Sequence, residues 1–297
     1  MSSSTRMTVS FAGSGVLALS DARRIIDFRR NGSASNHNGG GLVFAPDKSL
    51  LASVGDGGGN VGPNTAQDNR NLLGKVIRIL PNLTVGGSGY TIPPGNMFPA
   101  TNPPCTNVTQ SATACPEILA MGLRNPFRMS IDGNIVFLGD VGSNYEEINS
   151  FDYTKNTLNF GWPTHDGPVD SSTISGYRNL IVAYRRGIEA AAFRAEDPAA
   201  TQTGSASVII GEVYRGSNYA GVLDGALFFG DFYDGFNRYV GVSAGADGNG
   251  AITDADEVPG AHLVHENAIT SAVRGPDGFL YLTALLGPPA VYRLVRP

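Results

Sequence analysis

The feature that most constrains the fold is a short hairpin signature that occurs four times along the chain. In each copy a turn containing Asp lies between two apolar, strand-like runs, and the turns contain Asp47, Asp132, Asp224 and Asp277. Asp-Gly between apolar runs is a strong signal for a β-hairpin. Four such hairpins, separated by long insertions, indicate the blades of a β-propeller. Four unrelated hairpins are the alternative that the pattern leaves open.

Other parts of the chain fit an all-β fold with many turns. The sequence contains 39 Gly and 18 Pro, which favour turns over long helices. The only helix that we expect lies within residues 187–195, and residues 81–116 read as one long irregular segment. So long a loop in a compact domain is usually functional. Additional strands are expected from apolar and alternating runs at residues 7–11, 16–19, 24–28 and 74–80.

These patterns predict one domain, residues 1–297, without a linker. Residues 1–30 are expected to form a partial blade and residues 31–297 four blades with long loops. The net charge of -5 and the lack of a basic stripe argue against nucleic acid as a partner. No apolar run approaches the ~20 residues that span a membrane. The first residues lack the charged and apolar regions of a signal peptide.

The two cysteines, Cys105 and Cys115, lie in one polar loop. A pair this close predicts a local disulfide and therefore an oxidising compartment. Closing so short a loop should contribute roughly 2–3 kcal/mol to stability at most. Two free thiols are the alternative.

The first hairpin connects a histidine with a carboxylate. His37 precedes its first strand in a loop rich in Gly and Asn, and Asp56 follows its second strand. The hairpin should bring both residues to the same region. A carboxylate beside an imidazole fixes the tautomer of the ring and stabilises its protonated form, as a general base requires. A histidine packed at the rim of the sheet among glycine loops is the alternative.

Residues 118–127 are expected to end a strand in an Arg-Asn-Pro corner. The planar guanidinium of Arg124 offers a fork of donors suited to carboxylates or developing oxyanions. Asn125 stands beside it, and Pro126 helps to hold the corner. A structural arginine bonded to backbone carbonyls would give the same sequence pattern.

Two acidic stretches could hold a hard cation. Residues 139–149 carry three carboxylates near a glycine turn, and residues 159–170 add two Asp residues and the only Trp. Oxygen ligands of this kind suit calcium, although solvated loop charges are the common alternative. Residues 247–257 resemble an EF-hand loop, but the first position, Gly245, lacks an Asp and the twelfth lacks a bidentate Glu. We interpret that segment as a polar hairpin loop.

Several motifs in a fixed order resemble the soluble quinoprotein glucose/sorbosone dehydrogenase family, which includes the aldose sugar dehydrogenases. The resemblance covers roughly residues 24–297. The stretches that carry it are NHNGGGLVFAPDKSLLASVGDGGG, AQDNRNLLGKVIRI, EILAMGLRNPFRMSIDGNIVFLGDVGSNYEEIN and NFGWPTHDG, followed by GEVYRG, LDGALFFGDF and GPDGFLYLTALLGPPAVYRL.

The resemblance implies a six-bladed propeller that binds pyrroloquinoline quinone (PQQ) and calcium and oxidises the anomeric carbon of aldoses to lactones. His37 would then be the general base that takes the proton of the sugar hydroxyl, and Asp56 would orient it. The substrate hydride would pass to the quinone. Arg124 would stabilise charge on the reduced quinone, with Asn125 beside it.

The resemblance also implies two calcium sites. Backbone carbonyls of Gly142 and Ser143 would hold the calcium that polarises the quinone. A second, structural calcium would lie at Glu147, Phe160, Asp166 and Asp170. The implied partners are a sugar and an external electron acceptor, in the periplasm or outside the cell, and the resemblance leaves open a homo-oligomer.

The chain also departs from the family pattern. Only 36 residues precede His37, so the first blade and part of the second are expected to be absent, which leaves about four complete blades and a partial one. Where basic residues of the family clamp the cofactor carboxylates, this chain carries Phe232, Ala268 and Thr270. These departures keep open a truncated inactive homologue or a non-catalytic propeller that binds carbohydrate or protein. A metal-dependent lactonase is less favoured, because it needs a centre made of carboxylates.

Overall fold

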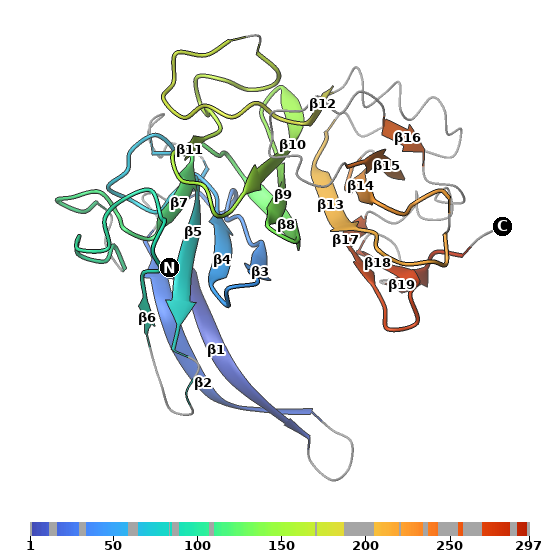
Figure 1. Ribbon diagram of the computed structural model, residues 1–297, viewed down its shortest axis with the longest axis horizontal. Coiled ribbons are helices and arrows are strands. Elements are labelled where there is room, and N and C mark those ends of the chain that lie inside the picture. Colours follow the sequence, from blue (N-terminus) through green and yellow to red (C-terminus); the bar gives the residue numbers. More distant parts are fainter. Residues whose placement is uncertain are drawn as a thin grey trace.

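The computed structural model is built from β-sheets (Figure 1). It describes residues 2–11, 17–29, 34–58, 65–82, 84, 89–106, 110–169, 171–186, 205–219, 221–233, 237–242, 255–257, 269–285 and 290–295. Within these ranges every regular element is a strand. No helix capable of crossing a membrane occurs in these ranges. The helix expected within 187–195 and most of the EF-hand-like loop, residues 247–254, lie outside them.

A two-stranded antiparallel ribbon opens the chain. It consists of β1 (Ser2–Phe11) and β2 (Leu17–Phe28). Two of the short strands expected before the first hairpin therefore form one long strand. Ile26 and Phe28, near the end of β2, are buried against the next sheet.

The first sheet contains the His37–Asp56 hairpin. Its strand order is β11-β7-β5-β4-β3, with β6 added to the end of β5. Only the β7–β11 pair is parallel among these neighbours. The bounds are β3 (Leu42–Phe44), β4 (Leu50–Val54), β5 (Lys75–Pro81), β6 (Tyr90–Thr91), β7 (Ile118–Met121) and β11 (Leu158–Asn159).

The second sheet starts at the Arg-Asn-Pro corner. Its order is β12-β10-β9-β8, and all of its neighbouring strands are antiparallel. The bounds are β8 (Pro126–Asp132), β9 (Ile135–Asp140), β10 (Tyr145–Asp152) and β12 (Val182–Arg185).

Two further antiparallel sheets complete the described chain. The third has the order β13-β14-β15-β16, and the fourth has the order β17-β18-β19. The bounds are β13 (Val208–Val213), β14 (Ala226–Asp231), β15 (Asn237–Gly241), β16 (Ala255–Glu257), β17 (Ile269–Arg274), β18 (Leu280–Ala284) and β19 (Ala290–Arg293).

Three of the four expected hairpins are present as tight connections. They join β3 to β4, β8 to β9 and β17 to β18. The third signature differs, because the twelve residues 214–225 separate β13 from β14 and Asp224-Gly225 stands only at the end of that connection. Gly225 has a φ of 76°, a backbone conformation that favours glycine, so the turn expected at Asp224-Gly225 is present. The connection between the two strands is longer than the predicted hairpin.

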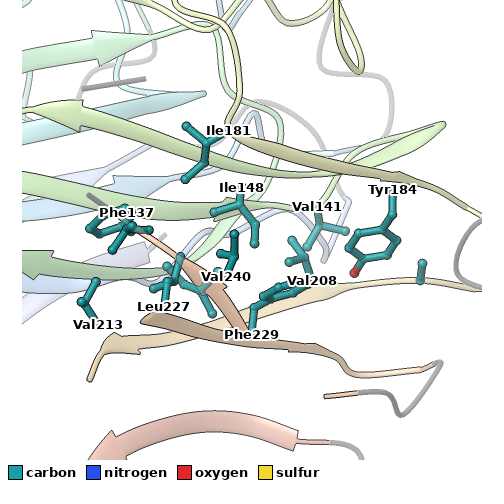
Figure 2. Close-up of a cluster of buried hydrophobic side chains, with 13 residues drawn as sticks. Phe137, Val141, Ile148, Ile181, Tyr184, Val208, Val213, Leu227, Phe229 and Val240 are labelled. Carbon is teal, nitrogen blue, oxygen red and sulfur yellow. The ribbon is translucent and has the colours of Figure 1, made fainter. Parts of the chain in front are cut away.

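The sheets pack face to face through apolar side chains. Figure 2 shows the cluster between the second and third sheets, where Phe137 and Ile148 meet Val208, Leu227 and Phe229. Similar clusters join the first sheet to the second and the third to the fourth. The first strands of successive sheets are neighbours: β8 lies beside β3 and β13, and β13 lies beside β17. Residues at the ends of these four strands are thereby gathered from distant parts of the sequence.

The expected disulfide between Cys105 and Cys115 is confirmed. Both cysteines are buried in the cluster that covers the outer face of the first sheet, together with Ile26 and Phe28. Backbone N–H groups of Ser111 and Cys115 donate to the carbonyls of Arg70 and Asn69. The disulfide loop therefore supports the segment that leads into β5.

Candidate functional site

His37 and Asp56 lie together, as the hairpin predicts. The distance between His37 Nδ1 and Asp56 Oδ1 is 2.7 Å, and the side chains are only 14% and 15% exposed. The two backbone segments touch as well, because Gly57 N donates to His37 O. A Cβ atom on Gly55 would lie 2.2 Å from His37 O, so this approach requires glycine at position 55.

Asp56 is held by three donors. Besides His37, Gly58 N donates to Oδ1 at 2.8 Å, and the indole Nε1 of Trp162 donates to Oδ2 at 3.0 Å. Burial by itself would raise the pKa of the Asp56 carboxyl, but these hydrogen bonds outweigh burial and lower that pKa below its usual value. Asp56 is therefore a carboxylate at neutral pH, which suits it to orient His37.

The Arg124-Asn125 corner is part of the same network. Asp56 N donates to Arg124 O at 2.7 Å, and Gly39 N donates to Asn125 Oδ1 at 3.3 Å. The Arg124 guanidinium donates to Val141 O at 2.7 Å and lies over the Trp162 ring, 5.4 Å from its centroid. Trp162 thus contacts both the carboxylate that orients His37 and the arginine.

A buried carboxylate fixes the backbone of the corner. Asp140 is 3% exposed and accepts the N–H groups of Arg124 and Asn125 at 2.9 and 2.6 Å. Burial raises the pKa of Asp140 to about 7, although both hydrogen bonds act in the opposite direction. Asp231 occupies the same place at the end of β14, where it accepts from Tyr184 Oη and Ser207 N. The last residue of β9 and the last residue of β14 therefore each join two neighbouring sheets.

The residues expected to bind metal are only partly brought together. Glu147 Oε1 accepts from Gly167 N at 2.6 Å, and the carboxylate of Asp166 accepts from the N–H groups of Ser143 and Asn144. Burial, together with the charges of Asp140 and Asp166, raises the pKa of Glu147 to about 8. The side chain of Phe160 is packed in the core against Phe151. Asp170 lies outside the described residues.

An arginine donates a hydrogen bond to one of the backbone carbonyls that were expected to hold the calcium next to the quinone. Arg186 Nη1 donates to Gly142 O at 2.9 Å and pairs with the buried Glu146 at 3.0 Å. A calcium ion at this carbonyl would have to share the oxygen with a guanidinium. No local pattern in the sequence indicates this contact.

Three residues that support the site were not predicted from the sequence. Trp162 was noted as the only Trp, but its bond to Asp56 spans 106 residues and follows no local pattern. Gln67 donates to the Trp162 carbonyl at 2.8 Å. The fully buried ammonium of Lys75 donates to the carbonyls of Thr65, Ala66 and Leu73 and so fixes the segment that carries Gln67. The one sequence signal for the role of Lys75 is its position as a lysine in an alternating, apolar strand.

Comparisons with known proteins agree with this architecture. HIPL2 protein from Arabidopsis thaliana is 30% identical over 306 residues, which cover 94% of this chain but only 41% of HIPL2. A solved glucose dehydrogenase superposes with a TM-score of 0.67 at 19% identity, covering 99% of this chain and 73% of that protein. The PQQ-bound aldose sugar dehydrogenase of Streptomyces coelicolor superposes with a TM-score of 0.62 at 20% identity, covering 97% and 70%.

At these identities the solved structures establish the fold, and the family is established by sequence. The sequence model of the family described as glucose / sorbosone dehydrogenase matches residues 3–284, nearly the whole chain. The chain spans less than half of HIPL2 and about three quarters of the solved glucose dehydrogenase. This chain belongs to the glucose/sorbosone dehydrogenase family.

Proposed function

We propose that this protein oxidises an aldose at its anomeric carbon to the lactone, with PQQ bound beside His37. The observation that carries the proposal is the hydrogen-bonded chain Trp162–Asp56–His37 next to Arg124. Family membership and the fold shared with the PQQ-bound aldose sugar dehydrogenase support it. The four sheets would be blades of a propeller, and the disulfide suits the periplasm or the outside of the cell.

His37 would act as the general base. With Asp56 accepting from Nδ1–H, the opposite ring nitrogen, Nε2, is the one that can accept a proton. The sugar hydroxyl would give its proton to Nε2, while Asp56 holds the ring and stabilises the imidazolium. PQQ, when bound, would supply the acceptor for the hydride that leaves the anomeric carbon. An external electron acceptor would then regenerate the oxidised cofactor.

The residues beside His37 fit a planar quinone with anionic oxygens. The Arg124 guanidinium donates to a carbonyl and stacks over the Trp162 ring. In the parts of the chain that the structure describes, it forms no ion pair with a carboxylate. Its positive charge acts on the nearby Asp140 carboxyl, whose pKa it lowers, but no ion pair among the described residues neutralises it, so an anionic ligand would find an unpaired guanidinium. Asn125, fixed by Asp140 and Gly39, would add an amide next to it.

Calcium fits the carboxylates better than the Gly142–Ser143 carbonyls. Glu147 and Asp166 share a region in which burial and mutual repulsion raise the pKa of Glu147, and a divalent cation would relieve that repulsion. Phe160, through its backbone carbonyl, and Asp170 would be further ligands. Gly142 O already accepts from Arg186, so a cation held there with Ser143 would share its ligand with a guanidinium.

A second candidate function is sugar binding without turnover. Two of the places where the family carries basic residues hold Phe232 and Thr270 in this chain, and the third, Ala268, lies outside the described residues. Together with the guanidinium on Gly142, this favours weaker cofactor binding.

The test is reconstitution of the purified protein with PQQ and calcium, followed by dye reduction with a panel of aldoses. Turnover that falls about 100- to 10,000-fold in His37→Asn, with PQQ binding retained, is the expected result. Asp56→Asn should do less harm, since it weakens orientation but leaves the base. Sugar binding without dye reduction by the reconstituted wild type would establish the second candidate instead. Unchanged turnover in His37→Asn would remove His37 from the mechanism.

A further inference from the structure

Arg128 is a second arginine at the start of β8 whose side chain connects two sheets. It follows Arg124 by four residues, and its Nε donates to Thr270 O at 2.7 Å. Thr270 belongs to β17 of the fourth sheet, whereas β8 belongs to the second, and β13 lies between them. The Arg128 side chain therefore reaches across the group of first strands.

The start of β8 lies against the His37 loop. A Cβ on Gly41 would lie 2.7 Å from the Cβ of Met129, and a Cβ on Gly40 would lie 4.0 Å from Phe127 O. Ser53 Oγ, just before Asp56, donates to Pro126 O at 2.7 Å. These contacts hold the backbone on both sides of Arg128 next to the segment that carries His37.

The charge of Arg128 has no anionic counterpart in the parts of the chain that the structure describes. Arg78, Arg186 and Arg215 each pair with a carboxylate. Arg128, in contrast, is half-buried, stacks on the Phe127 ring at 4.4 Å and bonds one neutral carbonyl. Burial lowers the pKa of its guanidinium, which remains charged because arginine keeps its proton in proteins. A desolvated cation without a partner is unfavourable, and an anionic ligand would compensate it.

We propose that Arg128 binds a carboxylate of the ligand that occupies the site beside His37. With Nε fixed by Thr270 O, the two terminal nitrogens present the end of the guanidinium fork, which matches the two oxygens of a carboxylate. The proposal rests on the proposed function for the identity of the ligand, PQQ, whose ring carries several carboxylates.

The test measures PQQ binding, and not turnover. Trp162 is the only tryptophan and contacts Asp56 and Arg124, so quenching of its fluorescence reports occupancy of this site. Arg128→Gln is compared with Arg215→Gln, a control that removes an exposed arginine paired with Asp132 at the far end of β8. Calorimetric titration provides the dissociation constant independently, and circular dichroism checks the fold of each variant.

Arg128→Gln should weaken PQQ binding about 10- to 100-fold, the usual effect of losing a charge-assisted hydrogen bond. Arg215→Gln should leave the dissociation constant unchanged. Arg128→Lys should recover part of the affinity, because it keeps the charge and loses the fork. The trimethyl ester of PQQ, which lacks the carboxylate charges, should bind Arg128→Gln and the wild type with similar affinity.

Equal PQQ affinity of Arg128→Gln and the wild type would overturn this inference and leave the proposed function intact. Equal loss of affinity for PQQ and its ester would also overturn it, because the arginine would then act only on the fold. Failure of the wild type to bind PQQ at all would overturn the proposed function itself. If Arg128→Gln does not fold, equal binding of PQQ and its ester by the wild type would still refute a carboxylate contact.

Discussion

Replacing Trp162 by Phe should remove one hydrogen bond from the site and little else. Phe keeps an aromatic ring under the Arg124 guanidinium but cannot donate to Asp56 Oδ2. A hydrogen bond to a charged group contributes roughly 1.5–3 kcal/mol, whereas one to a neutral group contributes about 1 kcal/mol. We therefore expect Trp162→Phe to lower the free energy of unfolding by about 2 kcal/mol at pH 7.

The pH dependence of that loss identifies its cause. Because the folded-state pKa of Asp56 is lowered, the stability that its ionisation contributes is present above the unfolded pKa and disappears as the pH falls through the folded one. Removing a donor moves the folded pKa of Asp56 back towards its usual value. The difference in stability between Trp162→Phe and the wild type should therefore shrink between pH 7 and pH 3.

The assay is urea unfolding followed by circular dichroism at several pH values, with Asp56→Asn and the double variant completing a cycle. The two single changes should not be additive, since each removes the same hydrogen bond. Additive losses, or a loss for Trp162→Phe that is the same at pH 3 and pH 7, would show that the indole acts through packing. The reasoning about the Trp162–Asp56–His37 chain would then be wrong.

Three further predictions concern the acidic region and the disulfide. Chelation of calcium should lower the melting temperature, as loss of a ligand bound only to the native state does; no shift would count against the site. In calcium-free protein the raised pKa of Glu147 should contribute stability that is complete below the unfolded value and is lost as the pH rises towards about 8. Glu147→Gln should flatten that decline in urea unfolding curves, and an unchanged slope would contradict the assignment. Denatured, unreduced protein should show no titratable thiol, and Cys105→Ser with Cys115→Ser should lose at most roughly 2–3 kcal/mol of stability; two titratable thiols would refute the pairing.

Local patterns in the sequence predicted the features that are determined by residues close together in the chain. The hairpins around Asp47, Asp132 and Asp277 form because a turn residue and its flanking apolar runs lie within about ten residues of each other. The His37–Asp56 pair and the disulfide lie within 19 and 10 residues. In each case one chain segment contains the whole interaction.

Contacts between distant segments of the chain could not be predicted in this way. The bond from Trp162 to Asp56 and the bond from Arg128 to Thr270 join residues 106 and 142 positions apart. The first bond joins the ends of two strands of one sheet, and the second joins two sheets, so both depend on tertiary arrangement, which side-chain periodicity does not encode. The bond from the Arg186 guanidinium to Gly142 O joins residues 44 positions apart and follows no local pattern either.

The repeated aspartate at the end of a second strand has a chemical consequence. In the second and third sheets this carboxylate accepts hydrogen bonds from backbone N–H groups and from a buried phenol, and these bonds hold neighbouring sheets together. In the first sheet the same position faces an imidazole. The same acidic position can therefore have a structural role in one sheet and belong to a pair that transfers protons in another. The difference lies only in the residues around it. Asp140→Asn or Asp231→Asn should accordingly lower the free energy of unfolding, whereas Asp56→Asn should lower the turnover proposed for His37.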